Sequence, residues 1–242
     1  TFNHDIVIDR KKYQPITSSL DLLSSKVNHL ESGYIFLSGG PGSGKSTLLN
    51  QWSKASTERI IKYYAFDFAN PSSHLNYHER GNAIHLFFDL VFQIKEEGIY
   101  KRDILPYKDL VFLKDVFYEQ IKYIGEEYNE SQQKTIIIID GLDHVPREYK
   151  SASTSFLREL PLPATLPSGV IIILGSQSYD LSDIPQEVKS EHQNSERTIK
   201  IDSLRKEDVY NYIDNVDFIA EVTLGIKSKI YEKSQGHPLY LS

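Results

Sequence analysis

The nine residues GGPGSGKST, from Gly39 to Thr47, fit the pattern G-x-x-x-x-G-K-[S/T] over Gly39 to Ser46. Their glycines permit dihedral angles and close approaches that side chains would obstruct, so backbone N–H groups can curl around a phosphate chain. An apolar stretch precedes the loop, and KSTLLNQW follows with a helical pattern. This context favours a phosphate-binding loop over an accidental match. The predicted binding residues are Gly39, Gly40, Pro41, Gly42, Ser43, Gly44, Lys45, Ser46 and Thr47.

Two side chains at the end of this loop predict its chemistry. Lys45 would bring a positive charge to the β- and γ-phosphates of a nucleotide, and the Ser46 hydroxyl would ligate Mg²⁺. The helix that begins here would point its N-terminus at the same anion. The loop therefore predicts a nucleotide and Mg²⁺ as ligands.

The stretch TIIIIDGLDHV, Thr135 to Val145, is an apolar run that ends in carboxylates. Asp140 would lie at the carboxyl edge of a parallel sheet, where open α/β folds bind ligands. We predict that Asp140 is the Mg²⁺ carboxylate of a Walker B motif, acting through a water. Asp143 is the candidate to orient or deprotonate an attacking water. The alternative for Asp143 is a loop-capping or surface carboxylate, because Asp is common in turns, and His144 is interpreted as a surface neighbour.

A third apolar run, VIIILGSQ, ends in polar residues. Ser176 and Gln177 would lie at the tip of a strand between the phosphate loop and Asp140. Either side chain could contact the γ-phosphate.

Short β-branched runs alternate with helical patterns along the chain, which predicts an α/β fold around a parallel sheet. The runs TIIIID and VIIILG do not alternate with polar residues, as expected of central strands covered on both faces. The five predicted strands are Tyr34–Ser38, Ile60–Phe66, Thr135–Ile139, Val170–Leu174 and Arg197–Ile201.

Between the strands, apolar stripes predict helices over Asn82–Glu97 and Leu110–Tyr128, and burial in the core explains their aromatic residues. The polar stretches Asp67–Asn82 and Ser182–Glu196 are predicted loops. His74 and His78 are spaced four apart, but without a helical pattern or an HExxH motif we do not expect them to bind a metal.

The pattern becomes wholly helical after Asp202. We therefore expect a nucleotide-binding domain over residues 1–202 and the start of a small helical lid, truncated, over residues 203–242. The absence of Met suggests a piece of a longer chain.

The composition excludes several classes of protein. The 242 residues carry 27 Lys and Arg against 33 Asp and Glu, a net charge of −6, with 40% hydrophobic residues and no Cys. This excludes disordered, collagen-like and disulfide-stapled chains, and it leaves no basic footprint for nucleic acid or an anionic membrane. The apolar runs of about five residues, such as Val170 to Leu174, are far short of a bilayer span of roughly 20 residues. We expect a cytoplasmic protein that contacts neither membrane nor nucleic acid.

These motifs together resemble the STAND class of P-loop NTPases, which is related to the AAA+ ATPases and includes NACHT and NB-ARC domains. The similarity is carried by GGPGSGKSTLL, by DGLD, by LGSQ, and by LRKEDVYNYI leading to SQGHPLYL, in that order along nearly the whole chain. The resemblance implies a three-layer α/β sandwich whose five parallel strands have the order 5-1-4-3-2. It also implies that Gly236 and Pro238 form the GxP motif of the lid, with Pro238 near the adenine.

The same resemblance suggests a role for the N-terminus. VIDR, with Ile8 and Arg10, is similar to an hhGR piece that touches the base, although Asp9 replaces the usual Gly. Two further departures from the family are Gln177, where many relatives carry Arg, and His144, where relatives often carry an acid. Both departures are compatible with slow hydrolysis.

The resemblance implies a molecular switch. ADP would hold a closed monomer, and exchange for ATP with Mg²⁺ would let copies of the chain assemble and activate an effector. Effector and sensor domains would lie elsewhere in the full-length chain. The stretch DGLDHV resembles the NACHT-type modules of bacterial and fungal defence proteins, and this resemblance suggests antiviral signalling. Adenine is inferred mainly from this resemblance, and also from the lack of an N-K-x-D guanine motif.

Two alternatives stay open. A continuously hydrolysing AAA+-like motor would need an arginine supplied by a neighbouring subunit, for which Arg147 and Arg158 are candidates. A pseudo-NTPase would keep nucleotide as a structural cofactor without catalysis.

Overall fold

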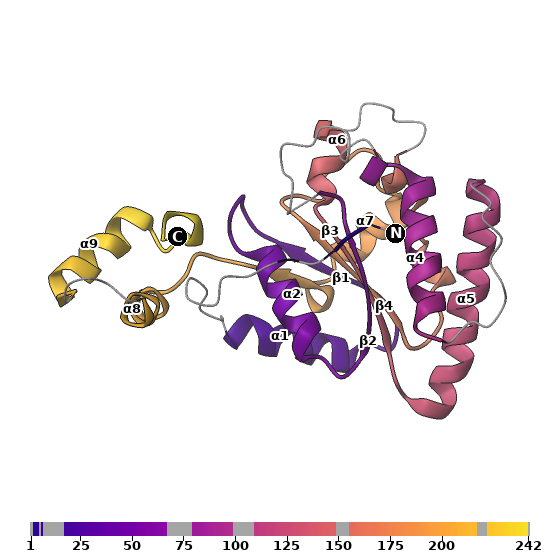
Figure 1. Cartoon of the computed structure of the whole chain (residues 1–242), viewed down its shortest axis with the longest axis horizontal. Helices are drawn as coiled ribbons and strands as arrows, with labels where there is room; N and C mark the ends of the chain where they lie inside the picture. The colour runs from indigo at the N-terminus through magenta and orange to yellow at the C-terminus, as the bar shows by residue number, and fades with distance from the viewer. Residues whose placement is uncertain are drawn as a thin grey trace.

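The computed structural model of the chain is an α/β sandwich with a small helical extension (Figure 1). The described residues are 2–4, 6, 17–66, 79–98, 109–148, 155–216 and 222–241.

The described part of the chain forms a five-stranded parallel sheet of order β2-β3-β4-β1-β5. Read from the other edge, this is the predicted order 5-1-4-3-2, which is therefore confirmed. Each predicted strand exists, with ends shifted by one or two residues. The strands are β1 (Gly33–Ser38), β2 (Arg59–Tyr64), β3 (Thr135–Asp140), β4 (Val170–Ser176) and β5 (Thr198–Lys200).

The central strands are buried on both faces, as their unbroken apolar runs predict. All six residues of β3 and all seven of β4 are buried. Successive side chains of a strand point to opposite faces, so Ile137 and Ile139 enter one core and Ile136 and Ile138 enter the other. The sheet thus separates two hydrophobic cores.

One core lies under α4 (Ala83–Glu96), α5 (Leu110–Ser131) and α7 (Gln186–His192). Both predicted helices of this layer are confirmed. Asn82 and Asp109 cap them by accepting hydrogen bonds from Ile84 and Val111 backbone N–H groups, at 2.8 and 3.1 Å. The helix α7 corrects the prediction of a polar loop over Ser182–Glu196, because the single buried Val188 was too weak a pattern to reveal it.

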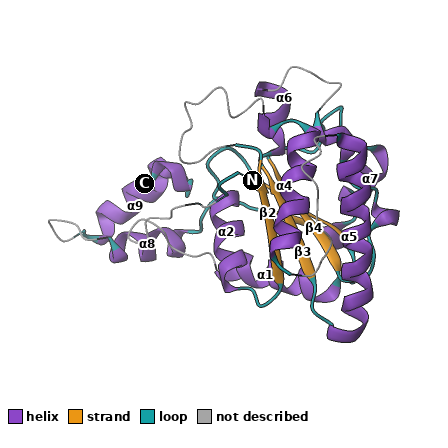
Figure 2. Cartoon of the chain, turned by 45° about the vertical axis from the view of Figure 1, so that its right-hand side comes forward, coloured by secondary structure: helices purple, strands orange, loops and turns teal. Residues whose placement is uncertain are grey.

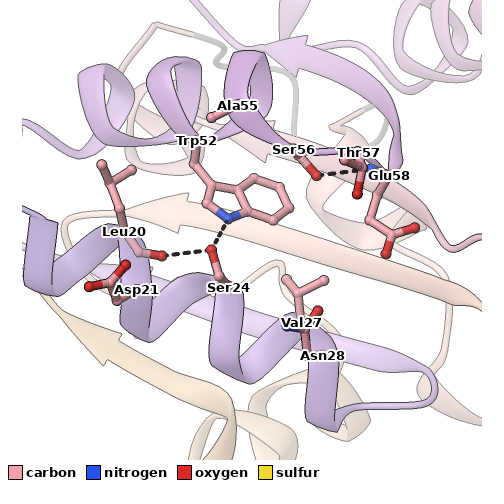
Figure 3. A pocket seen from close by; sticks show the side chains of 10 residues that line it. All are labelled: Leu20, Asp21, Ser24, Val27, Asn28, Trp52, Ala55, Ser56, Thr57 and Glu58. Atoms are coloured by element: carbon pink, nitrogen blue, oxygen red, sulfur yellow. Dashed lines mark hydrogen bonds between the residues drawn. The ribbon is translucent and has the colours of Figure 1, made fainter.

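The other core lies under α1 (Thr17–His29) and α2 (Lys45–Ala55), where Trp52 packs against α1. The Trp52 Nε1–H donates to Ser24 Oγ at 3.0 Å, and the Ser24 hydroxyl donates to the Leu20 carbonyl at 2.9 Å (Figure 3). A groove of about 390 Å³ opens beside Trp52. It lies at the C-terminal end of α2, whereas the phosphate loop lies at the N-terminal end of that helix, so the groove is not part of the predicted site.

The C-terminal helices lie beyond the sheet, on the side of α2 and away from α4 and α5 (Figure 2). They are α8 (Lys206–Asn215) and α9 (Leu224–Ser234), as the helical pattern after Asp202 predicts. Their own small core contains Leu204, Val209, Tyr212 and Ile213. We call residues 203–241 the lid; its boundary at residue 202 stays a prediction.

The remaining described helices are short. They are α6 (Val145–Glu148) and the 3-10 turns Leu142–His144, Phe156–Glu159, Pro163–Thr165, Ser195–Arg197 and Pro238–Tyr240. Within the described residues, every helix is too short or too polar to serve as a membrane span.

Lys134 gives a test of how α1 is held. Its ammonium donates to the Val27, Asn28 and Leu30 carbonyls at 2.7, 3.0 and 2.8 Å, at the C-terminus of α1. We expect Lys134→Met to lower the free energy of unfolding by about 1–3 kcal/mol, because these carbonyls lose a charged donor. Urea denaturation measures this, with the exposed Lys122→Met as the matched control. Equal losses in both variants would contradict the prediction.

His192 gives a pH test. Burial lowers the pKa of His192, whose ring packs against Phe36 and Tyr179. The unfolded chain then binds more protons than the folded chain at acid pH, so stability falls as the pH falls below about 6.5. We expect His192→Gln to flatten this decrease between about pH 7 and pH 5.5. Chemical denaturation across this range checks it, and a slope in His192→Gln equal to that of the wild type would contradict the prediction.

Candidate functional site

The phosphate loop connects β1 to α2, and its backbone favours glycine at two places and is tightly packed at a third. Gly42 and Gly44 have φ angles of 67° and 93°, in the left-handed region that favours glycine. A Cβ atom on Gly39 would lie 2.6 Å from Ser43 Oγ. The loop is therefore a compact turn whose shape follows directly from the GGPGSG sequence.

Lys45 lies at the first position of α2 and folds back over the loop. Its ammonium donates to the Gly39 and Gly40 carbonyls, at 2.7 and 3.1 Å. Burial lowers the pKa of Lys45, and the carboxylates of Asp140 and Asp143 oppose that shift. The charge of Lys45 is thus held at the loop by weak neutral partners that phosphate oxygens can replace.

Asp140 ends β3 and faces the same helix terminus. Its Oδ2 accepts a 2.5 Å hydrogen bond from the Ser46 hydroxyl, and its Oδ1 accepts one from the Gly141 N–H at 2.9 Å. Only 1% of Asp140 is exposed. Burial raises the pKa of its carboxyl, while the Ser46 hydrogen bond and the Lys45 charge lower it.

Ser46 and Asp140 fit the predicted Mg²⁺. Both offer oxygen donors, the ligand type that Mg²⁺ prefers, and Mg²⁺ usually completes its shell with phosphate oxygens and waters rather than with more side chains. Among the described residues, no group of three or more His, Asp or Glu side chains is gathered as an all-protein metal cage.

Gly175 of β4 lies between the loop strand and Asp140. In the register of the sheet, Gly175 is paired with Asp140. A Cβ atom at this position would lie 2.0 Å from Asp140 Oδ1. The carboxylate therefore reaches Ser46 across β4 only because residue 175 has no side chain.

Asp143 lies in the 3-10 turn after β3 and is 5% exposed, so it is not a surface carboxylate, whereas the loop-capping alternative stays open. Its Oδ1 accepts a 3.1 Å hydrogen bond from the backbone N–H of Gln177. This bond ties the turn after β3 to the end of β4. His144, half-buried, stacks on Phe66 with ring centroids 4.9 Å apart.

The two predicted γ-phosphate contacts differ in their surroundings. The Ser176 hydroxyl donates to the Ser178 carbonyl at 2.6 Å, and the residue has no exposed surface. The Gln177 residue lines a cavity of about 600 Å³ together with Ser38 at the end of β1. The helices α2 and α7 that follow β1 and β4 cover opposite faces of the sheet. The strands β1 and β4 are neighbours, and their following helices cover opposite faces. Such a pair of strands forms a topological switch point, where open α/β sheets bind ligands.

The lid reaches the phosphate loop through its predicted GxP motif. His237, between Gly236 and Pro238, contacts the Pro41 carbonyl through its Nε2 at 2.8 Å. Pro238 opens the 3-10 turn that follows. The sequence placed Pro238 near the nucleotide but did not single out His237, because nothing in a loop sequence reveals a partner 196 residues away.

Several predicted residues lie outside the described residues. These are Ile8, Arg10, His74 and His78; the side chain of Arg147 is also not described. The carbonyl of Ile6 accepts a 3.2 Å hydrogen bond from Asn50 Nδ2 on α2. Ile6 is therefore bonded to the helix that follows the phosphate loop.

A second N-terminal anchor was also missed by the sequence analysis. His4 Nε2 lies 2.5 Å from Oδ2 of Asp89 on α4, and the Phe2 N–H donates to the other carboxylate oxygen at 2.9 Å. The sequence carries no signal for this pair, because the burial of the Asp89 carboxylate, which demands a partner, appears only in the fold.

The candidate trans-acting Arg158 is already engaged within the chain. Its Nε and Nη2 donate to Oδ1 of Asp183 at 3.0 and 2.9 Å. Half of the Arg158 side chain is exposed.

The glycine loop, the strand-end aspartates and the sheet order define a P-loop NTPase. Residues 33–218 match the NACHT domain family, and the chain belongs to that family. This confirms the resemblance to STAND-class P-loop NTPases that the motifs indicated, and it makes the chain a nucleotide-binding domain. No curated protein matches the chain.

Three solved structures have a similar fold. The Walker-type ATPase of Pyrococcus abyssi is 17% identical, covers 99% of this chain and has a TM-score of 0.57. Drosophila ORC, in a structure bound to DNA, is 8% identical, covers 100% and has a TM-score of 0.53. Cdc6p of Pyrobaculum aerophilum is 16% identical, covers 86% and has a TM-score of 0.50. This chain spans 68%, 61% and 53% of those chains, respectively.

Gly175 gives a direct test of the strand-end geometry. We expect Gly175→Ala to weaken Mg²⁺-dependent nucleotide binding, because the new methyl group displaces the Asp140 carboxylate. Overpacking should also lower stability by about 1–3 kcal/mol. Calorimetric titration with and without Mg²⁺ measures the first effect. Gly225→Ala in α9 is the control, since a Cβ there meets only Thr223 Oγ1 at 4.0 Å. Unchanged Mg²⁺-dependent binding in Gly175→Ala would contradict the assignment of Asp140.

Proposed function

We propose that this domain is an adenine-nucleotide switch of a larger chain, closed with ADP and released by exchange for ATP with Mg²⁺. The observation that carries the proposal is the contact between His237 of the lid and Pro41 of the phosphate loop. A nucleotide bound in the loop would lie next to a separate unit that can move. Ligand binding shifts such an equilibrium through contacts that differ between the two states.

Each residue of the site would make a different contact with the nucleotide or with Mg²⁺. Lys45 would transfer its hydrogen bonds from the Gly39 and Gly40 carbonyls to phosphate oxygens. Ser46 and Asp140 would hold Mg²⁺, which when bound neutralises charge on the phosphates. The N-terminus of α2 adds the partial positive charge of its unpaired N–H groups.

Asp143 would orient or deprotonate the water that attacks the γ-phosphate. Its place is favourable, since it is buried near Lys45 and is fixed by the Gln177 N–H. The same hydrogen bond takes up one carboxylate oxygen, and Gln177 carries no charge to stabilise the transition state. We therefore propose slow hydrolysis, as a switch with a long resting state requires.

Further parts of the proposal rest on the family. NACHT membership supports assembly of copies after activation, effector and sensor domains elsewhere in the full-length chain, a cytoplasmic location, and a role in antiviral defence signalling. We also propose a domain boundary at residue 202, with the lid packed on its own core.

The motor alternative gains no support from Arg158, because this guanidinium is paired with Asp183 of the same chain. An arginine acting on a neighbouring subunit would have to leave that partner first.

The proposal predicts what the purified protein holds and how two variants behave. Denaturing the untreated protein should release ADP in about a one-to-one ratio, as a closed and slowly exchanging site requires. Lys45→Ala should lose nucleotide binding, and Asp143→Asn should keep binding while hydrolysis falls by about 10²- to 10⁴-fold, the usual contribution of a catalytic base. Chromatography of released nucleotide and single-turnover hydrolysis measure these effects.

The exposed Lys54→Ala in the last turn of α2 is the matched control for Lys45→Ala. An empty site with fast turnover of added ATP would favour a motor. Hydrolysis unchanged in Asp143→Asn would favour a pseudo-NTPase or another base.

A further inference from the structure

His237 contacts the phosphate loop from the opposite end of the chain. Its Nε2 lies 2.8 Å from the carbonyl oxygen of Pro41. A carbonyl oxygen can only accept, so Nε2 carries the hydrogen and donates it. Proline has no N–H group, and its carbonyl is the only hydrogen-bonding group that Pro41 offers.

Two side chains therefore donate hydrogen bonds to the carbonyls of the loop. Lys45 holds the Gly39 and Gly40 carbonyls, and His237 holds the next carbonyl, that of Pro41. Lys45 belongs to the helix that follows the loop, whereas His237 belongs to the lid. Three successive peptide units of the loop are therefore fixed by both parts of the molecule.

The turn that presents His237 is itself rigid. The carbonyl of Gly236 accepts a 2.8 Å hydrogen bond from the Leu204 N–H, and the His237 N–H donates to the Ser234 carbonyl at 2.9 Å. Gly236 has a φ angle of 70°, and a Cβ atom there would lie 2.1 Å from the Leu204 carbonyl oxygen. Movement of His237 therefore carries the start and the end of the lid with it.

The contact has an unfavourable component that keeps it reversible. The other ring nitrogen, Nδ1, is buried and has no hydrogen-bond partner among the described residues. In the neutral ring it is an acceptor removed from water, and this desolvation offsets part of the gain from the bond to Pro41. The contact can thus close over a nucleotide and open again.

We propose that His237 is a positioning residue that clamps the lid to the phosphate loop and so sets the rate at which bound nucleotide leaves. This inference rests on the proposed function. It assigns the lid contact a kinetic role: the nucleotide leaves only after the hydrogen bond to Pro41 has broken. The contact that His237 makes is with the backbone of the loop.

The test uses a fluorescent ADP analogue released from the whole protein in a stopped-flow instrument. A neutral hydrogen bond of ordinary net strength predicts that His237→Ala speeds release about three- to tenfold. His237→Gln should restore the slow rate, because its amide nitrogen lies as many bonds from the backbone as Nε2. His237→Asn is too short to reach Pro41 and should behave like His237→Ala.

The control variant is Lys233→Ala, which changes an exposed side chain at the end of α9 and should release the analogue at the wild-type rate. Rapid release from His237→Ala and His237→Asn, slow release from His237→Gln, and equal unfolding midpoints support the clamp. Equal release rates in the wild type and His237→Ala overturn it, and so does fast release from His237→Gln. Wild-type protein that binds no analogue contradicts the proposed function instead, before the clamp is tested.

Discussion

The hydrogen bond between Ser46 and Asp140 is the constraint on which the site depends. The Asp140 carboxylate is buried at the end of a central strand, and a buried charge is costly unless donors surround it. Its donors are the Ser46 hydroxyl and the Gly141 N–H. Because β4 lies between β1 and β3, the carboxylate has to reach over a neighbouring strand to meet the phosphate loop. The missing side chain at Gly175 makes that reach possible. The sheet order and Gly175 of LGSQ together therefore allow Asp140 to reach Ser46.

Lys45 and Asp140 compensate one another within this arrangement. Burial disfavours both charged forms, which lowers the pKa of Lys45 and raises that of Asp140, and the charge of each opposes the shift of the other. Lys45 also uses loop carbonyls as temporary partners. Lys45 thereby fixes the backbone of the loop as well as balancing the charge of Asp140.

The sequence reveals the parts of this molecule that local chemistry decides. Unbroken apolar runs identified β3 and β4, and the glycine spacing identified the loop, because buried parallel strands and close phosphate approach each demand particular residue types. The helix α1 escaped notice although Leu23 and Val27 are buried, since it depends on packing under Trp52 and on Lys134 at its end. Contacts between distant segments, such as His237 with Pro41 and His4 with Asp89, have no local signature at all. They arise only once the sheet has brought the segments together.

The interactions within the lid differ in kind from the interaction that joins the lid to the phosphate loop. Its apolar residues serve a small core of its own, centred on Val209 and Ile213, whereas its contact with the phosphate loop is a hydrogen bond. Apolar burial is the main force that keeps domains together, and a single neutral hydrogen bond adds little net free energy. In the proposed switch, closure of the lid would therefore draw on contacts that a bound nucleotide supplies. A ligand moves such an equilibrium only by the difference between its affinities for the two states. The structure puts Pro41, Lys45 and His237 at that meeting point.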